Sequence, residues 1–282
     1  MKTIRTIAVC GAGTMGSGIA QLAAQAGFTT IQFDLNPVAL EKSRASITAQ
    51  LDKQVEKAKI TAAEKEQVLS RMQFSSDLAD CRADIIIEAI LEDKAIKTKL
   101  FNDLAAINDP SVIFATNTSS ISIDAIAAGM DYPEKLVGMH FFNPAPVMKL
   151  VEVIRGHHAD PQLVEQVYQL ALRLGKAPVV CKDAPGFIVN RVARHYYLEA
   201  MEMVEKGLVT IEQADALMEA AGFKMGPFRL MDLIGLDINY SVSNIVWEAL
   251  GRPERLTPSS LQKAKVDQGN LGKKTGEGFY QY

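Results

Sequence analysis

Short aliphatic runs alternate with longer amphipathic segments over the first two-thirds of the chain. We expect strands at 6–10, 29–34, 84–90, 112–116, 136–139 and 150–154. We expect helices at 17–26, 37–59, 61–72 and 160–175. A capping box formed by Thr61 and Glu64 opens the third of these helices. Regular alternation of strands and helices predicts an α/β fold, a Rossmann-type doubly wound sheet.

The pattern changes after residues 179–181, and from Gly186 onward the chain shows almost only helical periodicity. Helices are expected at 188–206 and 210–222, then a shorter one after Gly226–Pro227, and two more at 237–250 and 259–268. Asp237 is expected to cap the fourth of them. The Pro-Gly pair at 185–186 breaks the chain. We therefore divide it into a Rossmann-type domain, residues 1–184, and an all-α C-terminal domain, residues 185–282.

Composition excludes several classes of protein. Of the 282 residues, 48% are hydrophobic and 22% charged, as is usual for a globular protein. The formal net charge is −3, whereas domains that bind duplex nucleic acid usually carry a strong basic excess. We find no apolar stretch of the roughly 18 residues that a membrane span requires, and the early apolar run 7–10 is too short for a secretion signal.

Cysteine usage points to a reducing compartment. Cys10, Cys81 and Cys181 are odd in number and far apart, so neither a disulfide framework nor a zinc motif is expected. We expect a cytoplasmic protein that binds no metal, nucleic acid or membrane.

A glycine-rich motif, Gly11–Ala12–Gly13–Thr14–Met15–Gly16, directly follows the first predicted strand. In a dinucleotide fingerprint these glycines allow a tight turn, close approach of the pyrophosphate, and close packing of helix on strand. Asp34 ends the second predicted strand, about twenty residues after Gly11, where an acid binds the ribose 2′-hydroxyl. A carboxylate would repel a 2′-phosphate, so NAD is favoured over NADP. The alternative is an ordinary glycine turn, with Asp34 as a helix cap.

Two ionisable residues are candidates for proton transfer. His140 is expected just past the C-terminal end of the 136–139 strand, at the edge where open α/β sheets bind ligands. An imidazole there would shuttle a proton near neutral pH. Glu152 lies in an otherwise aliphatic strand and, if buried, needs a partner. A histidine partner would fix the imidazole tautomer. The alternatives are a core histidine and a solvent-facing glutamate.

Further polar residues lie near predicted strand and helix ends. The segment 117–120, Asn-Thr-Ser-Ser, follows the 112–116 strand and would either bind a substrate oxygen or cap the next helix. Asn190 falls in the first turn of the 188–206 helix, where it would reach across an interdomain cleft or only join the domains. His157 and His158 are expected in a loop, and His195 in packing or on the surface.

Several segments together resemble the L-3-hydroxyacyl-CoA dehydrogenase family, including its short-chain 3-hydroxybutyryl-CoA type. In chain order they are GAGTMGSGIA, NTSSISI, GMHFFNPAPVMKLVEVI, KDAPGFIVNR, MGPF, LIGLD and LGKKTGEGFY. The GMHFFNP block with LVEVI is highly specific, whereas GxGxxG alone is not. The resemblance covers nearly the whole chain.

The resemblance implies the chemistry of the site. His140 would take the proton of the substrate's 3-hydroxyl while a hydride passes to NAD, and Glu152 would orient His140. Ser119 and Asn190 would hydrogen-bond the reacting oxygens. The positions that match cofactor contacts are Gly11, Ala12, Gly13, Thr14, Met15, Gly16, Asp34, Ala89, Glu92, Lys97, Asn117, Ser119, Asn143 and Lys274. For Glu92 and Lys97 the alternative is a pair of helix-start charges in solvent.

The resemblance also implies an acyl-CoA substrate and a homodimer formed through the C-terminal helices. Lys57 best matches a basic position that holds the CoA, although it would otherwise be part of a solvated helix face. Gln50 stands where the family has a small hydroxyl residue. A short-chain substrate, 3-hydroxybutyryl-CoA, is expected. The alternatives are a related hydroxy-acid or 3-hydroxyadipyl-CoA dehydrogenase and a non-catalytic NAD-binding protein.

Overall fold

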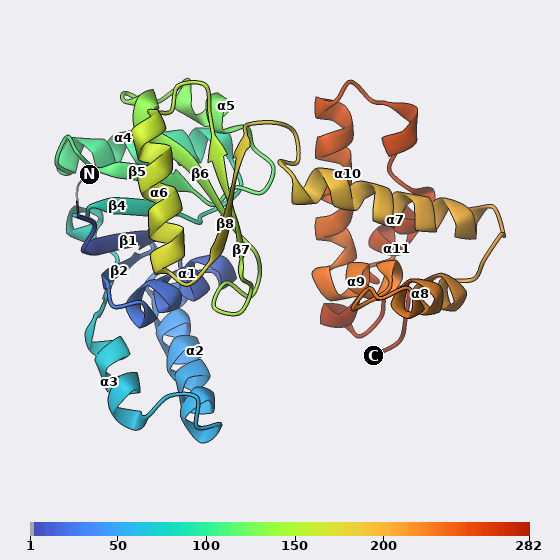
Figure 1. Cartoon of the computed structure of the whole chain (residues 1–282), viewed down its shortest axis with the longest axis horizontal. Coiled ribbons are helices and arrows are strands. Elements are labelled where there is room, and N and C mark those ends of the chain that lie inside the picture. The colour runs from blue at the N-terminus through green and yellow to red at the C-terminus, as the bar shows by residue number, and fades with distance from the viewer. Residues whose placement is uncertain (1–2) are drawn as a thin grey trace. The chain divides into compact units, whose positions relative to one another are not determined.

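The computed structural model of the chain describes residues 3–282. The chain divides into two compact units, with the break after Asp183. Figure 1 shows a unit that mixes strands and helices, followed along the chain by a unit of helices. This arrangement confirms the predicted fold class, and the break lies one residue from the predicted domain boundary.

One eight-stranded sheet forms the centre of the first unit, in the order β3-β2-β1-β4-β5-β6-β7-β8. The strands are β1 (Thr6–Cys10), β2 (Thr29–Phe33), β3 (Met72–Ser75), β4 (Ile85–Glu88), β5 (Ile113–Thr116), β6 (Leu136–Phe141), β7 (Leu150–Arg155) and β8 (Ala177–Lys182). Among these described strands, neighbours run parallel except for the antiparallel pair of β6 and β7. The order 3-2-1-4-5-6 is that of dinucleotide-binding sheets.

Helices cover both faces of this sheet (Figure 1). They are α1 (Thr14–Gln25), α2 (Pro37–Glu56), α3 (Ala62–Ser70), α4 (Lys94–Ile107), α5 (Ile123–Ala127) and α6 (Pro161–Arg173), with short 3₁₀ turns at Leu78–Asp80 and Pro133–Lys135. Apolar residues of α1 and α6 join alternate strand residues in one core cluster. On the other face, Phe101 of α4 packs against Phe114 of β5, with ring centroids 5.3 Å apart. Burial on both faces explains the aliphatic strands.

The predicted elements of this unit mostly exist, with shifted ends. The first helix begins at Thr14, earlier than the predicted residue 17, because the glycine motif itself enters the helix. The capping box of Thr61 and Glu64 is confirmed. The elements β3, β8, α4 and α5 were not predicted from the sequence. The placement of His140 beyond its strand was wrong: β6 continues to Phe141 because its antiparallel pairing with β7 extends that far.

The second unit consists of helices. They are α7 (Val189–Glu205), α8 (Ile211–Ala220), α9 (Pro227–Ile234), α10 (Leu236–Ala249) and α11 (Ser260–Asp267), with 3₁₀ turns at Glu254–Leu256 and Lys273–Thr275. The prediction that Asp237 caps a helix was wrong, since α10 begins one residue earlier, after Gly235. Gly235 adopts φ +104°, which suits glycine and allows α9 and α10 to follow each other directly. Among the helices of residues 3–282, we find none with the length and apolarity to cross a bilayer.

Two buried carboxylates anchor the C-terminal residues to this helical unit. Asp215 accepts hydrogen bonds from the backbone N–H of Phe228 and from the Tyr280 hydroxyl, both at 2.8 Å. Asp232 accepts from the backbone N–H of Tyr280 at 2.9 Å. The segment that ends the chain is therefore part of the packed unit.

Candidate active site

The glycine motif forms the turn between β1 and α1. A side chain on Gly11 would collide with the Ala89 carbonyl, and one on Gly16 with the Gly11 carbonyl. A Cβ on Gly13 would meet nothing within 4 Å. Among the described residues no side chain caps the N-terminus of α1, and its first turn holds no acid. The open space over Gly13, next to the positive end of a helix, fits a pyrophosphate.

Asp34 lies beside this turn, at the end of β2. Its Oδ2 accepts a hydrogen bond from the Ala12 backbone N–H at 2.8 Å, and its Oδ1 accepts from the Asn36 backbone N–H at 2.9 Å. The side chain that caps α2 is Asn36, not Asp34, which removes the helix-cap interpretation. The carboxylate is thus fixed next to the glycine turn, where the fingerprint requires an acid for the ribose.

A series of buried hydrogen bonds, not predicted from the sequence, holds the glycine turn in place. Gln32 donates to the Gly11 carbonyl at 3.2 Å, and the Ser43 hydroxyl lies 2.7 Å from both Gln32 Oε1 and Ser17 Oγ. Serine and glutamine carry no sequence signal of their own at these positions, because their partners come from β2, α1 and α2.

His140 and Glu152 are paired residues of the antiparallel strands β6 and β7. His140 Nδ1 lies 2.7 Å from Glu152 Oε2, and the two residues are 6% and 1% exposed. Glu152 is therefore not the solvent-facing glutamate of the alternative reading. The Phe142 ring packs on the imidazole, with centroids 4.6 Å apart. Asn117 Oδ1 accepts a hydrogen bond from the Phe141 backbone N–H at 2.8 Å, which ties the end of β5 to β6.

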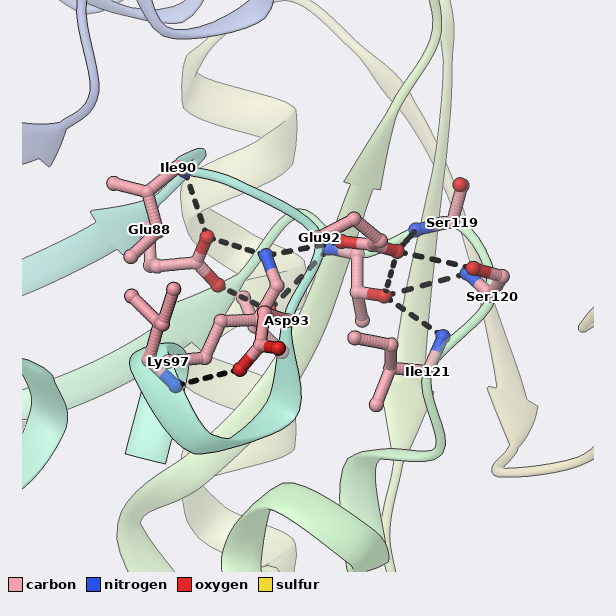
Figure 2. Close-up of polar contacts among 11 residues, drawn as sticks. Glu88, Ile90, Glu92, Asp93, Lys97, Ser119, Ser120 and Ile121 are labelled. Carbon is pink, nitrogen blue, oxygen red and sulfur yellow. Dashed lines mark hydrogen bonds and ion pairs between the residues drawn. The ribbon is translucent and has the colours of Figure 1, made fainter. Parts of the chain in front are cut away.

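A second charged cluster lies at the ends of β4 and β5 (Figure 2). Lys97 Nζ lies 2.5 Å from Glu88 Oε1 and 3.0 Å from Glu92 Oε2, and the lysine is only 1% exposed. The solvent interpretation of Lys97 was therefore wrong. Glu88 was not predicted as a site residue. Its signal was a single carboxylate ending a run of isoleucines, which requires a buried partner.

Glu92 connects this cluster to the loop after β5. Its Oε1 accepts hydrogen bonds from Thr118 Oγ1 at 2.5 Å, from Ser120 Oγ at 3.1 Å and from the Ser119 backbone N–H at 3.2 Å. Burial alone would raise the pKa of Glu92, but the Lys97 ammonium and these hydroxyl donors outweigh it and hold the pKa below its ordinary value. Glu92 is therefore a carboxylate at neutral pH and fixes the loop that carries Ser119.

Asn143 follows β6 in an exposed loop that a buried lysine stabilises. Lys176 Nζ donates to the Ala145 carbonyl at 2.5 Å and to the Met148 carbonyl at 2.9 Å. Desolvation lowers the pKa of Lys176, as expected for an ammonium whose partners here are neutral carbonyls. The sequence offered no sign of this, because Lys176 follows a helix end and its partners lie far back in the chain.

The remaining predicted residues belong to other segments of the chain. Gln50 and Lys57 belong to the α2–α3 hairpin and are exposed. Asn190 and Lys274 lie in the second unit, Asn190 in the first turn of α7 as predicted. Lys274 Nζ lies 2.6 and 2.7 Å from the two carboxylate oxygens of Asp237. The histidines outside β6 are exposed, namely His157, His158 and His195.

The fold, the glycine turn and Asp34 define an NAD-binding domain, and comparison with known families agrees. Residues 6–184 match the NAD-binding domain of 3-hydroxyacyl-CoA dehydrogenase, and residues 186–282 match the C-terminal domain of the same enzymes. The chain belongs to the 3-hydroxyacyl-CoA dehydrogenase family, NAD-dependent oxidoreductases that act on a CH–OH group. NAD is thereby confirmed as the cofactor.

Individual relatives carry two kinds of name. The chain is 46% identical over 284 residues to 3-hydroxyadipyl-CoA dehydrogenase of Escherichia coli, covering 100% of this chain but only 60% of that relative. It is 42% identical to a probable 3-hydroxybutyryl-CoA dehydrogenase of Deinococcus radiodurans, covering 97% of this chain and 99% of the relative. The crystal structure of (S)-3-hydroxybutyryl-CoA dehydrogenase from Ralstonia eutropha superimposes with a TM-score of 0.95 at 38% identity, covering 99% of each chain.

Proposed function

We propose that this chain catalyses the reversible, NAD-dependent oxidation of an (S)-3-hydroxyacyl-CoA to the 3-ketoacyl-CoA. The observation that carries the proposal is the buried contact between His140 and Glu152 on β6 and β7. An imidazole braced by a carboxylate is the arrangement that general-base catalysis on an alcohol needs. Family membership supplies the acyl-CoA class of the substrate.

In this mechanism the contact with Glu152 determines which nitrogen of His140 acts. Glu152 accepts a hydrogen bond from Nδ1–H, so the neutral imidazole presents Nε2 as the base. Nε2 takes the proton of the 3-hydroxyl, and the imidazolium that forms is stabilised by the Glu152 carboxylate. When bound, NAD would supply the acceptor for the hydride that leaves C3 of the substrate. In the reverse direction His140 returns the proton.

Other residues hold the reactants. Ser119, on the loop fixed by Glu92, and Asn190, in the first turn of α7, hydrogen-bond the reacting oxygens. The CoA is held by the α2–α3 hairpin, with Lys57 and Gln50 as contacts. The cofactor is held by the glycine turn and by further residues, namely Asp34, Ala89, Glu92, Lys97, Asn117, Ser119, Asn143 and Lys274.

The acyl group that we propose first is short, as in 3-hydroxybutyryl-CoA, because several relatives of matching length carry that name. A second candidate is 3-hydroxyadipyl-CoA. It is favoured by the 46% identity to the Escherichia coli enzyme of that name, which is higher than the 42% identity to the Deinococcus relative.

Initial rates of NADH formation across a substrate panel test both the acyl-CoA class of the substrate and the identity of its acyl group. The panel contains 3-hydroxybutyryl-CoA, a long-chain 3-hydroxyacyl-CoA, 3-hydroxyadipyl-CoA and free 3-hydroxybutyrate. We expect thioesters to exceed the free acid by at least about 100-fold in kcat/KM, because remote binding energy of the CoA contributes to catalysis. Turnover of free acids alone would contradict the proposal. The order of the thioesters decides the acyl group.

We also propose that the protein is a cytoplasmic homodimer. Large apolar side chains are exposed on the helices of the second unit, among them Val192, Leu233 and Ile238. Such surfaces suit a two-fold interface. The three cysteines in the described chain are free thiols, which accords with a reducing compartment. A monomeric mass in light scattering would contradict the dimer.

A further inference from the structure

The cluster of Glu88, Lys97 and Glu92 contains two acids and one base. Both oxygens of Glu88 accept hydrogen bonds, Oε1 from Lys97 Nζ at 2.5 Å and from the Ile90 backbone N–H at 2.8 Å, and Oε2 from Thr116 Oγ1 at 2.7 Å. Acceptance at both oxygens is what an ionised carboxylate does. With Glu92 also ionised, the cluster carries a surplus of one negative charge.

Burial decides where this surplus lies. Glu88 is 0% exposed and Lys97 1% exposed, so each of these charges depends on the other for compensation. The side chain of Glu92 is 37% exposed. Figure 2 shows the Lys97 ammonium between the two carboxylates, with the loop of Ser119 and Ser120 beyond Glu92. Lys97 also contacts Glu92, so the two acids share its charge, and the surplus of one negative charge lies toward Glu92, the exposed member of the cluster.

The fold relates this charge to the cofactor. In a dinucleotide-binding sheet the adenosine ribose lies at the acid after β2 and the pyrophosphate at the glycine turn after β1. The nicotinamide half therefore belongs to the side of β4, β5 and β6, where Glu92 and Ser119 lie. The nicotinamide ring is cationic in NAD⁺ and neutral in NADH, so a negative charge there distinguishes the two forms.

We propose that Glu88 is a positioning residue that makes the site bind NAD⁺ in preference to NADH. Glu88 compensates the charge of Lys97 inside the protein, so that the negative charge of Glu92 remains to favour the cationic nicotinamide of NAD⁺. This inference rests on NAD as the cofactor and on none of the acyl-CoA assignments. A purely structural role of Glu88 makes a different prediction, because loosening the loop would weaken both cofactor forms alike.

The test measures dissociation constants without any acyl-CoA. NADH binding is followed by its fluorescence and NAD⁺ binding by calorimetry, for the wild type and for Glu88→Gln, Glu92→Gln and Thr116→Val. The first two variants each remove the surplus charge. Thr116→Val removes no charge, only the hydrogen bond to Glu88 and one that Thr116 accepts from the Thr118 backbone N–H. Circular dichroism checks that each variant is folded.

We expect the ratio Kd(NAD⁺)/Kd(NADH) to rise by about 5- to 20-fold in Glu88→Gln and in Glu92→Gln, the size of one partly screened charge interaction. In Thr116→Val the ratio should stay within about twofold of wild type. Equal weakening of both cofactors in the glutamate variants, or no change, would overturn the proposal. If Glu88→Gln does not fold, Glu92→Gln decides, since an unchanged ratio there removes the charge on which the proposal rests. Because no acyl-CoA is present, neither outcome bears on the substrate assignment.

Discussion

Nδ1 of His140 and Oε2 of Glu152 lie 2.7 Å apart across the one antiparallel strand pair among the described strands of the sheet. Directly paired residues of antiparallel strands hold their Cβ atoms about 5 Å apart on the same face. The reversal of β7 therefore places the carboxylate beside the imidazole by strand register alone. A contact made by two buried strands is more rigid than one made by a loop, which suits an orienting role.

Replacing Glu152 by glutamine tests that role. The glutamine amide N–H₂ would donate to Nδ1 and favour the opposite tautomer, in which Nε2 carries the proton and is no longer a base. We expect kcat to fall by about 10- to 1,000-fold, while the Kd for NADH stays close to wild type. Glu165→Gln, an exposed change on α6, is the matched control. A kcat within about twofold of wild type in Glu152→Gln would mean that the carboxylate does not orient His140.

Asp34 determines the expected cofactor selectivity. Asp34→Arg removes the proposed acceptor for the ribose 2′-hydroxyl and adds a cation for a 2′-phosphate, so the ratio of kcat/KM for NADP to that for NAD should rise by at least about tenfold. Asp34→Asn removes the charge and one acceptor oxygen but adds no cation, and it keeps one oxygen for either the Ala12 or the Asn36 backbone N–H. It should therefore shift the ratio less. Unchanged selectivity in Asp34→Arg would exclude the ribose contact.

The raised pKa values of Tyr280 and Tyr282 predict that the second unit loses stability at alkaline pH. Burial and the contact with Asp215 raise the pKa of Tyr280, and burial near Asp232 raises the pKa of Tyr282 to about 12. An unfolded tyrosine titrates near about 10. The neutral phenols thus stabilise the folded state fully below about pH 10, and this contribution is lost as the pH rises from there through the folded pKa values.

Tyr280→Phe checks this linkage. Loss of the 2.8 Å hydrogen bond to Asp215 should destabilise the chain by about 1 kcal/mol at pH 8. The destabilisation relative to wild type should shrink at pH 11, where the wild type has itself begun to lose the contribution. Denaturant midpoints at the two pH values measure it, with Tyr132→Phe in the first unit as the control. If Tyr280→Phe destabilised the chain equally at pH 8 and pH 11, the raised pKa of Tyr280 would be contradicted.

Much of the fold was accessible from the sequence because its signals are local. Glycines in a fixed pattern, the capping box at Thr61, and aliphatic runs all report on their own segments. The strand β3 was missed because its four residues are only partly buried at the sheet edge. The cap assigned to Asp237 failed because Gly235, a residue without a side chain, makes the actual break.

The site was accessible in part, for the same reason. His140 and Glu152 could be chosen because a carboxylate in an aliphatic strand requires a partner, but their contact depends on the register of β6 with β7. Glu88 carried the same signal and was overlooked. That Lys97 is buried could not be read from a helix-start lysine, since its burial depends on two carboxylates brought together by the sheet.

The most direct test of the central claim is the turnover of His140→Ala with 3-hydroxybutyryl-CoA and NAD, followed through NADH absorbance, with the exposed His195→Ala as the control. Removal of a general base typically costs about 100- to 10,000-fold in rate. We predict a loss of kcat in that range for His140→Ala, with NADH binding retained and His195→Ala close to wild type. Turnover of His140→Ala at the wild-type rate would contradict the mechanism proposed for this chain.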